Sequence, residues 1–168
     1  HPIPYQGSKR RLAPLILGHF PDCVATLYEP FAGSAAMSIA AATRAPNTRF
    51  RFGDSFSPLV GIWSLILADP TRLADDYERL WHAQQADPRA FYNETRAAFN
   101  AEGGAARLLY LLARCVKNAV RFSQAGEFNQ SPDNRRLGRR PATMRDHIPR
   151  AHKRLRGRSE ASDRKSGT

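Results

Sequence analysis

The sequence predicts an α/β fold that begins with parallel strands and continues into a helical region. Two short apolar segments each end on an acidic residue and lead into an apolar stretch with helical spacing. This strand-helix-strand-helix order is typical of a parallel sheet with crossover helices. From residue 71 onward, three helical stretches follow with no strand between them. The length of 168 residues suits one domain of ordinary size.

The alternating part is predicted over residues 1–70. Its expected elements, in order, are a short helix over Ser8–His19 capped by Ser8, a strand over Val24–Glu29, a helix over Ser34–Thr43, a strand over Arg49–Asp54 and a helix over Ser57–Leu67. Apolar side chains three or four residues apart mark one face of the first and last helices: Leu12, Leu15 and Ile16 in the first, and Leu59, Ile62, Trp63 and Ile66 in the last.

The remainder is predicted as a helical lobe over residues 71–156 and a disordered tail over residues 157–168. The lobe is expected to contain helices over Thr71–Gln85, Pro88–Asn100 and Gly103–Val120, a hairpin or loop that turns at Gln124–Gly126, and a basic helix over Pro141–Arg156. The tail is polar and has no large apolar residue. A parallel sheet of only two strands cannot cover both its faces and its edges. Either the later helices hide a further strand, or something outside the chain completes the sheet.

Charge indicates a polyanionic partner. The chain has 26 Lys and Arg against 15 Asp and Glu, a net charge of +11, and ten of the basic residues fall between Arg135 and Arg158, where Asp146 is the one acid. Such a cluster favours nucleic acid, and a solvated tail that keeps the protein soluble is the alternative. No apolar run approaches the ~18–20 residues of a membrane span, and no metal-binding pattern occurs. The isolated Cys23 and Cys115 suit a reducing cytoplasm.

The two strand-end acids mark the expected ligand site. In open parallel sheets, ligands bind at the carboxyl ends of the strands, where Glu29 and Asp54 are predicted to lie. An acid after the second strand can accept hydrogen bonds from ribose hydroxyls, and Gly33 lets backbone approach a ligand. The turn EPFAGS matches neither the three-glycine dinucleotide motif nor a P-loop. The alternative is an ordinary turn with acids facing solvent.

Four segments resemble motifs of the Dam-like (D12) class of N6-adenine DNA methyltransferases. They are PIPYQGSKRRLAPLI from residue 2, LYEPFAGSAA from residue 27, FGDSFSPLV from residue 52 and CVKNAVRFSQAGEFNQSP from residue 115. The first resembles a W/Y-x-G-x-K motif, the second DPFxGSG, the third the strand-two acid motif and the fourth the target-recognition hairpin. The resemblance covers residues 2–156 and implies a partial Rossmann-like methyltransferase sheet with an inserted helical DNA-recognition lobe.

The resemblance also implies S-adenosylmethionine (AdoMet) as cofactor and double-stranded DNA as substrate. For AdoMet it implies Tyr5 packing on the cofactor, Lys9 meeting its carboxylate, Glu29, Phe31 and Gly33 lining it, and Asp54 holding the ribose. For DNA it implies Asn118, Arg121 and the Gly126–Asn129 turn, and the basic cluster adds Arg135 and Arg136. Arg121 is also of the residue type that reads guanine with two hydrogen bonds.

Other roles remain open for several of these residues. Lys9 could be a solvated lysine and Phe31 a core aromatic, Arg121 could contact phosphate alone, and Asn118 could hydrogen bond the backbone of its own loop. The sequence also departs from the family motifs. Ala35 replaces the third glycine of the AdoMet turn, which requires a negative φ there. Ala119 and Ser123 replace a Gly and an Asn of the recognition motif, which leaves the DNA sequence unassigned.

The catalytic DPPY motif of the family has no counterpart in these residues. The chain contains no Pro-Pro, and the Asp-Pro pairs at Asp69 and Asp87 head predicted helices. No catalytic residue is therefore assigned. Three interpretations fit: one subunit of a split enzyme whose second subunit carries the DPPY motif, a truncated product, or a non-catalytic DNA-binding relic with a vestigial AdoMet pocket.

Overall fold

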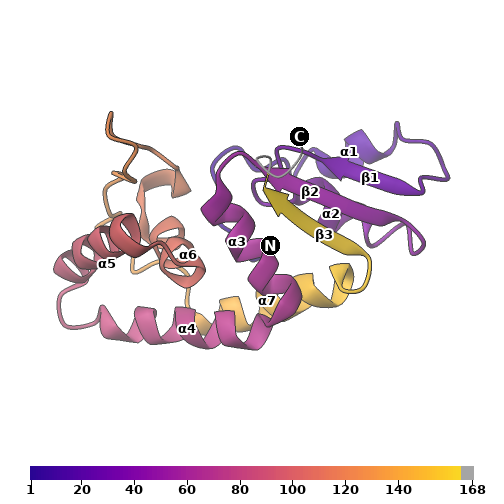
Figure 1. Ribbon diagram of the computed structural model, residues 1–168. Coiled ribbons are helices and arrows are strands. Elements are labelled where there is room, and N and C mark those ends of the chain that lie inside the picture. The colour runs from indigo at the N-terminus through magenta and orange to yellow at the C-terminus, as the bar shows by residue number, and fades with distance from the viewer. Residues whose placement is uncertain (164–168) are drawn as a thin grey trace.

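A computed structural model describes residues 1–163, which form a three-stranded parallel sheet with helices packed beside it (Figure 1). The strands are β1 (Thr26–Glu29), β2 (Arg49–Asp54) and β3 (Ser159–Asp163), in the order β1-β2-β3. Strand β2 alternates as its sequence predicts, because Phe50 and Phe52 are buried while Arg51 is exposed. The predicted mixed α/β class with a parallel sheet is confirmed.

Helices make up most of the remaining chain. They are α1 (Ala13–Leu17), α2 (Ala36–Ala41), α3 (Ser57–Ala68), α4 (Pro70–Ala83), α5 (Pro88–Glu102), α6 (Ala105–Arg114), the short 3-10 helix η1 (Val116–Asn118) and α7 (Pro141–Leu155). The two Asp-Pro pairs start helices, as predicted. The Asp69 carboxylate accepts the Arg72 N–H at the start of α4, and the Asp87 carboxylate accepts the N–H groups of Arg89 and Ala90 at the start of α5.

One continuous apolar core runs from the sheet into the helical region. Helix α3 contacts β2 and β3 on one side and α6 and α7 on the other. Its predicted inward residues, Leu59, Ile62, Trp63 and Ile66, are all buried, which confirms that face. Helices α4 and α7 pack along each other below α3 in Figure 1. The helical region is therefore anchored to the sheet through α3 and α7.

The first helix is shorter than predicted and turns its apolar face outward. Helix α1 starts at Ala13, directly before Pro14, which fits the first turn of a helix and no later position. Ser8 does not cap it, since the Ser8 hydroxyl lies 2.5 Å from that of Ser34. Leu12 and Leu15, expected on an inward face, are 49% and 65% exposed. This part of the chain is held by its contact with the turn after β1.

The prediction of a disordered tail from residue 157 is wrong for residues 159–163, which form β3. This strand carries little apolar surface, and backbone pairing with β2 holds it instead. Gly53 allows the close approach, because a Cβ there would lie 2.7 Å from the Ser162 carbonyl oxygen. The third strand thus comes from the end of the described chain, which neither of the two alternatives for completing the sheet anticipated. Residues 164–168 of the predicted tail lie outside the described residues.

Arg158 fixes the start of β3. Its guanidinium donates hydrogen bonds to the carbonyl oxygens of Ala45 and Pro46, both at 2.8 Å, and lies over the ring of Phe50 at 5.3 Å. The Phe50 N–H in turn donates to the Arg158 carbonyl oxygen at 2.8 Å. One of the ten clustered basic residues is therefore used to hold the sheet.

None of the helices within residues 1–163 combines the length and apolar character that a membrane crossing needs. In the same part of the chain, no group of three His, Cys, Asp or Glu side chains is placed to hold a metal ion. Cys23 is exposed and Cys115 is buried, and burial raises the pKa of the Cys115 thiol to about 11. A thiol with a raised pKa carries little thiolate, so Cys115 behaves as a small core residue.

Candidate functional site

The turn after β1 is the centre of the candidate site. Gly33 is buried with a φ of 49°, in the left-handed region that favours glycine. Its N–H donates to the Asp54 carboxylate at 3.0 Å, and its carbonyl accepts the indole N–H of Trp63 at 3.0 Å. A Cβ at Gly33 would lie 3.2 Å from the ring of Tyr5. Three predicted cofactor residues, Tyr5, Gly33 and Asp54, therefore meet at the carboxyl ends of β1 and β2.

Asp54 retains hydrogen-bonding capacity for a ligand. One carboxylate oxygen accepts the Gly33 N–H and the other accepts the Phe56 N–H at 3.1 Å. A carboxylate offers about four acceptor positions, so roughly two remain. Burial raises the pKa of the Tyr5 phenol, and the negative charge of Asp54 raises it further. The pair therefore presents a neutral aromatic ring beside an anionic acceptor.

Glu29 supports the helix that follows the turn. Its carboxylate accepts the N–H of Met37 at 3.2 Å, the N–H of Ser38 at 2.9 Å and the Ser38 hydroxyl at 2.6 Å. Helix α2 has no capping side chain at its own N-terminus, and Glu29 supplies that function from β1. Burial raises the pKa of Glu29, while the bonds from Ser38 and Met37 oppose the shift. Most of this carboxylate is committed within the fold.

The backbone of Ala35 does not have the negative φ expected for a residue other than glycine in this turn. Its φ is 45°, in the left-handed region. A non-glycine residue in this conformation costs about 1–2 kcal/mol. Ala35 is fully buried, so the packed turn around it holds the strained conformation.

The other two predicted cofactor residues lie at the surface of the same region. Lys9 is exposed, and its carbonyl oxygen accepts the N–H groups of Leu12 and Ala13 in the turn before α1. Phe31 is 68% exposed, which excludes the core role left open for it. Both side chains are accessible to a ligand that binds over the Gly33 turn.

The segment predicted to turn at Gln124–Gly126 forms a tight loop. Phe122 and Phe128 form an antiparallel bridge, and the Gly126 N–H donates to the Ser123 carbonyl across the turn at 3.0 Å. Gly126 has a φ of 80°, which requires glycine or strain. Arg121 and Asn129 are exposed, as a DNA-contacting role requires.

The side chain of Asn118 hydrogen bonds the protein backbone. Its side-chain amide donates to the Leu112 carbonyl oxygen at 2.7 Å, at the end of α6, and its own carbonyl accepts the Gln6 N–H at 2.9 Å. This is the backbone-bonding role that the sequence left open. The structure therefore does not bring the Asn118 side chain together with the exposed Arg121 and Asn129.

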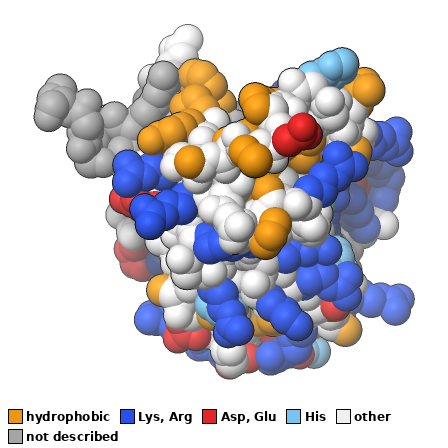
Figure 2. Space-filling view, turned by 90° about the vertical axis from the view of Figure 1, so that its right-hand side faces the viewer, with side chains coloured by type: hydrophobic (Ala, Val, Ile, Leu, Met, Phe, Trp, Pro, Cys, Tyr) orange, Lys and Arg blue, Asp and Glu red, His pale blue; other side chains and the backbone are white. Residues whose placement is uncertain are grey.

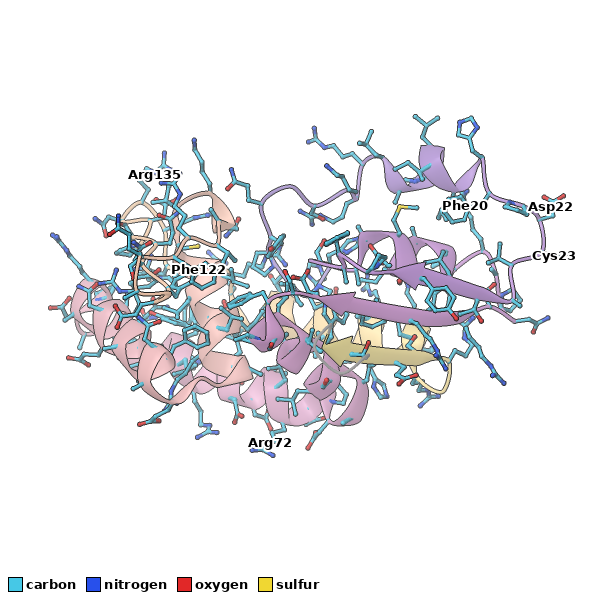
Figure 3. All side chains as sticks on the ribbon, turned by 45° about the horizontal axis from the view of Figure 1, so that its top comes forward. Phe20, Asp22, Cys23, Arg72, Phe122 and Arg135 are labelled. Atoms are coloured by element: carbon cyan, nitrogen blue, oxygen red, sulfur yellow. The ribbon has the colours of Figure 1, made fainter. Side chains whose placement is uncertain are left out.

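An aromatic contact joins the loop around Gly126 to the region of the Gly33 turn. The rings of Phe56 and Phe122 pack edge to face with centroids 5.1 Å apart, and Figure 3 places Phe122 where the helical region meets the sheet. Phe56 follows Asp54 by two residues and donates its N–H to the Asp54 carboxylate. Neither aromatic was among the residues predicted from the sequence. The position of Phe56 directly after the strand-end acid was the available signal.

Several basic residues of the cluster are paired inside the fold. Arg145 on α7 forms an ion pair with Glu78 on α4 and another with Asp75 at 2.7 Å. Arg135 and Arg136 both pair with Asp133, with N–O distances of 3.0 and 3.1 Å. Three carboxylates, Asp75, Glu78 and Asp133, therefore offset part of the positive charge of the cluster.

Comparison with known proteins gives one family. A family model described as D12 class N6 adenine-specific DNA methyltransferase matches residues 5–164, which span the three strands, the Gly33 turn and the loop around Gly126. No curated protein matches the chain.

Proposed function

This chain belongs to the D12 class of N6 adenine-specific DNA methyltransferases, and from that membership we propose that it is the AdoMet-binding and DNA-recognition portion of a site-specific adenine N6-methyltransferase. Enzymes of this family methylate adenine in DNA, generally with AdoMet as methyl donor and often within restriction-modification systems. The observation that carries the proposal is the meeting of Tyr5, Gly33 and Asp54 at the strand ends, directly beside the recognition loop.

The residues at the strand ends fit AdoMet. The free acceptor positions of Asp54 suit ribose hydroxyls, and Tyr5 offers a ring face next to the Gly33 turn. Lys9 is the exposed cation for the carboxylate of the methionine part, and Phe31 adds exposed apolar surface. Glu29 acts chiefly by fixing α2, with its remaining acceptor position open to the cofactor. AdoMet supplies the methyl group, and these residues bind and orient it.

Residues 71–156 are proposed as the target-recognition lobe inserted into a Rossmann-like sheet. Arg121 and Asn129 face outward on the loop that touches the cofactor turn, and Gly126 gives the loop its tight end. Arg121 is assigned to base recognition and the basic side chains Arg135 and Arg136 to the DNA backbone. We also propose a cytoplasmic location, where the DNA substrate would be accessible.

Catalysis requires a second polypeptide segment that carries the DPPY motif, which these 168 residues lack. Asp69 and Asp87 cap α4 and α5 and are unsuited to the role. Within the described residues, β1 pairs only with β2, so its other edge is open. Hydrophobic side chains gather in the upper half of the face shown in Figure 2, and exposed Tyr28 and Leu15 lie on β1 and α1. We place the missing catalytic strand of a second subunit beside β1.

The alternative is a non-catalytic DNA-binding relic or fragment of such an enzyme. AdoMet binding separates the two, because a relic with a vestigial pocket does not retain it. Asp54→Ala should weaken AdoMet binding by about 1–3 kcal/mol, roughly 5- to 150-fold, through loss of hydrogen bonds to the carboxylate. Calorimetry with AdoMet measures the effect in the chain and in its assembly with a DPPY-bearing subunit.

The matched control for this measurement is Asp22→Ala. Asp22 is an exposed acid in the segment before the start of β1 (Figure 3), whereas Asp54 lies at the carboxyl end of β2, so the loss of Asp22 should leave AdoMet affinity unchanged. Thermal unfolding of both variants separates a lost ligand contact from a disrupted Gly33 turn. Equal AdoMet affinities in wild type and Asp54→Ala, with the turn intact, would contradict the assignment of Asp54.

Arg121→Ala should relax the DNA sequence preference at one base pair by about 1–3 kcal/mol. An exposed guanidinium that donates two hydrogen bonds to guanine contributes discrimination at that base and little elsewhere. Selection of bound duplexes from a randomised pool, followed by sequencing, measures the preference position by position. A uniform loss of affinity across all sequences would instead make Arg121 a phosphate contact.

A further inference from the structure

Two loops of the recognition lobe form a cationic hollow. The segment that follows α6 and the segment before α7 run side by side, joined by a bridge between Cys115 and Pro132. Between them lies an open hollow of about 510 Å³ lined by Lys117, Asn118, Asp133, Arg135 and Arg136. Three of the five lining side chains are cationic. Figure 3 shows Arg135 at the outer surface of the lobe, away from the sheet.

The carboxylate of Asp133 organises this hollow. It accepts the backbone N–H of Arg135 at 3.1 Å and two guanidinium N–H groups of the same residue at 3.0 and 3.2 Å. The Arg136 guanidinium pairs with the same carboxylate at 3.1 Å. The Asp133 side chain is only 6% exposed, whereas Arg135 and Arg136 are 84% and 46% exposed. One inward carboxylate therefore orients two outward guanidiniums. The side-chain and backbone hydrogen bonds from Arg135, helped by the charges of Arg135 and Arg136, lower the pKa of Asp133 to about 2.

Lys117 is held in a strained conformation at the same hollow. Lys117 and Asn118 have φ values of 59° and 53°, adjacent left-handed residues with no glycine between them. The conformation costs about 1–2 kcal/mol for Lys117 and less for Asn118, so the surrounding contacts must impose it on the lysine. The amide of Asn118 bonds the Leu112 carbonyl, and the Val116 N–H bonds the Ser131 carbonyl at 3.0 Å. These bonds hold both sides of the strained pair and fix the place from which the Lys117 side chain extends.

We infer that Lys117, Arg135 and Arg136 form one binding site for a phosphate of the DNA backbone, assembled around the carboxylate of Asp133. This rests on the proposed DNA-binding function and names a new residue, Lys117, and an organising residue, Asp133. The three cations and the one carboxylate leave the site with a charge of +2, which matches an anionic phosphodiester. Guanidinium groups already oriented by Asp133 lose less side-chain freedom when they bind phosphate.

The decisive variant is Asp133→Asn in the full chain. It raises the net charge of the protein by one, so an unspecific electrostatic model expects tighter DNA binding. The organised site predicts the reverse, a loss of about tenfold in affinity for a mixed-sequence duplex, comparable to one charge-assisted hydrogen bond. Fluorescence anisotropy measures the affinity. Tighter binding by a folded Asp133→Asn protein would show that Asp133 competes with DNA, and would overturn the organising role.

Exposed residues test the site without altering its support. Lys117→Gln and Arg136→Gln should each weaken DNA binding, while the slope of log K against log salt concentration should fall by no more than about 1 in total when both are changed. Because both side chains bind one phosphate, the double variant should lose less affinity than the sum of the two single losses. Arg72→Gln is the control, since Arg72 is 69% exposed on α4 and far from Arg135 in Figure 3. Its slope should equal that of the wild type.

The outcomes distinguish this inference from the proposed function. Additive losses for Lys117→Gln and Arg136→Gln would assign the two residues to separate phosphates and overturn the single site. DNA affinity equal to that of the wild type in both single variants and in the double variant would overturn it as well. A wild-type chain that binds no duplex DNA would instead remove the proposed function on which the inference rests.

Discussion

Incubated with AdoMet and unmethylated duplex DNA, the 168-residue chain alone should transfer no methyl group, and a second chain that carries the DPPY motif should restore transfer. The exocyclic amine of adenine is a poor nucleophile because its lone pair is delocalised into the ring. In this family the Asp side chain and the Pro-Pro backbone accept its hydrogens, and the aromatic stacks on the flipped base. A single preorganised hydrogen-bonding group of this kind contributes about 10²–10³-fold to a rate.

Tritium transfer from labelled AdoMet to DNA measures this activity, and mass spectrometry of the digested DNA identifies N6-methyladenine. The control is the same second chain with the Asp of its DPPY motif changed to Ala, which should remain inactive. Turnover by the lone chain would show that the catalytic residues lie within this sequence and were missed. An absence of turnover with both chains would favour the relic or fragment.

Arg114→Met should lower the free energy of unfolding by about 3–5 kcal/mol. Arg114 is 1% exposed, and its guanidinium bonds the Gln84 side chain at 2.8 Å and the Asp133 carbonyl at 2.7 Å. It also bonds the carbonyl oxygens of Arg136 and Pro88. Methionine fills similar volume but leaves these acceptors buried without donors. Chemical denaturation measures the loss, and a fall in Tm of roughly 10 °C should accompany it.

Two further variants make the Arg114 result interpretable. Arg114→Lys keeps the charge but replaces a planar fork of donors by one ammonium group, so an intermediate loss is expected. Arg72→Met removes an exposed arginine whose ion pair with Asp76 spans 3.9 Å, and its effect should stay within about 0.5 kcal/mol. If Arg114→Met were as stable as the wild type, hydrophobic packing would outweigh the hydrogen bonds from Arg114 to the loop of residues 133–136.

Regular periodicity made much of the fold predictable. Strand β2 matches its predicted bounds, and α3 buries the four residues that its spacing selected, because alternation and helical spacing reflect burial directly. Strand β3 could not be found in this way. Its sequence, SEASD, has no large apolar side chain, and what admits it is the missing Cβ of Gly53 on the neighbouring strand. A strand that is held by backbone pairing with its neighbour need not show a hydrophobic pattern in its own sequence.

The location of the candidate site was predictable because acidic residues stand at the ends of the two predicted strands. Tyr5, Gly33 and Asp54 come together at the strand ends, while their AdoMet-binding roles and the DNA-binding roles of the other residues remain predictions. The structure commits the Asn118 amide to the end of α6, which residue type alone could not reveal. The pairing of Asp133 with two nearby arginines was visible in SPDNRR only as an acid before two basic residues, and its burial required the fold.

The position of β3 at the end of the described chain has a consequence for how the protein reaches its native state. Strand β2 ends at Asp54, yet the strand that covers its second edge begins at Ser159, so the whole helical lobe lies within one connection. During synthesis the sheet must wait until that lobe has been made, while the helices can form from nearby residues. We therefore expect the lobe to fold first and to bring the ends of the long connection together. Mutations that slow folding of the lobe should then delay sheet formation. The edge of β2 would stay unpaired for longer, which favours aggregation.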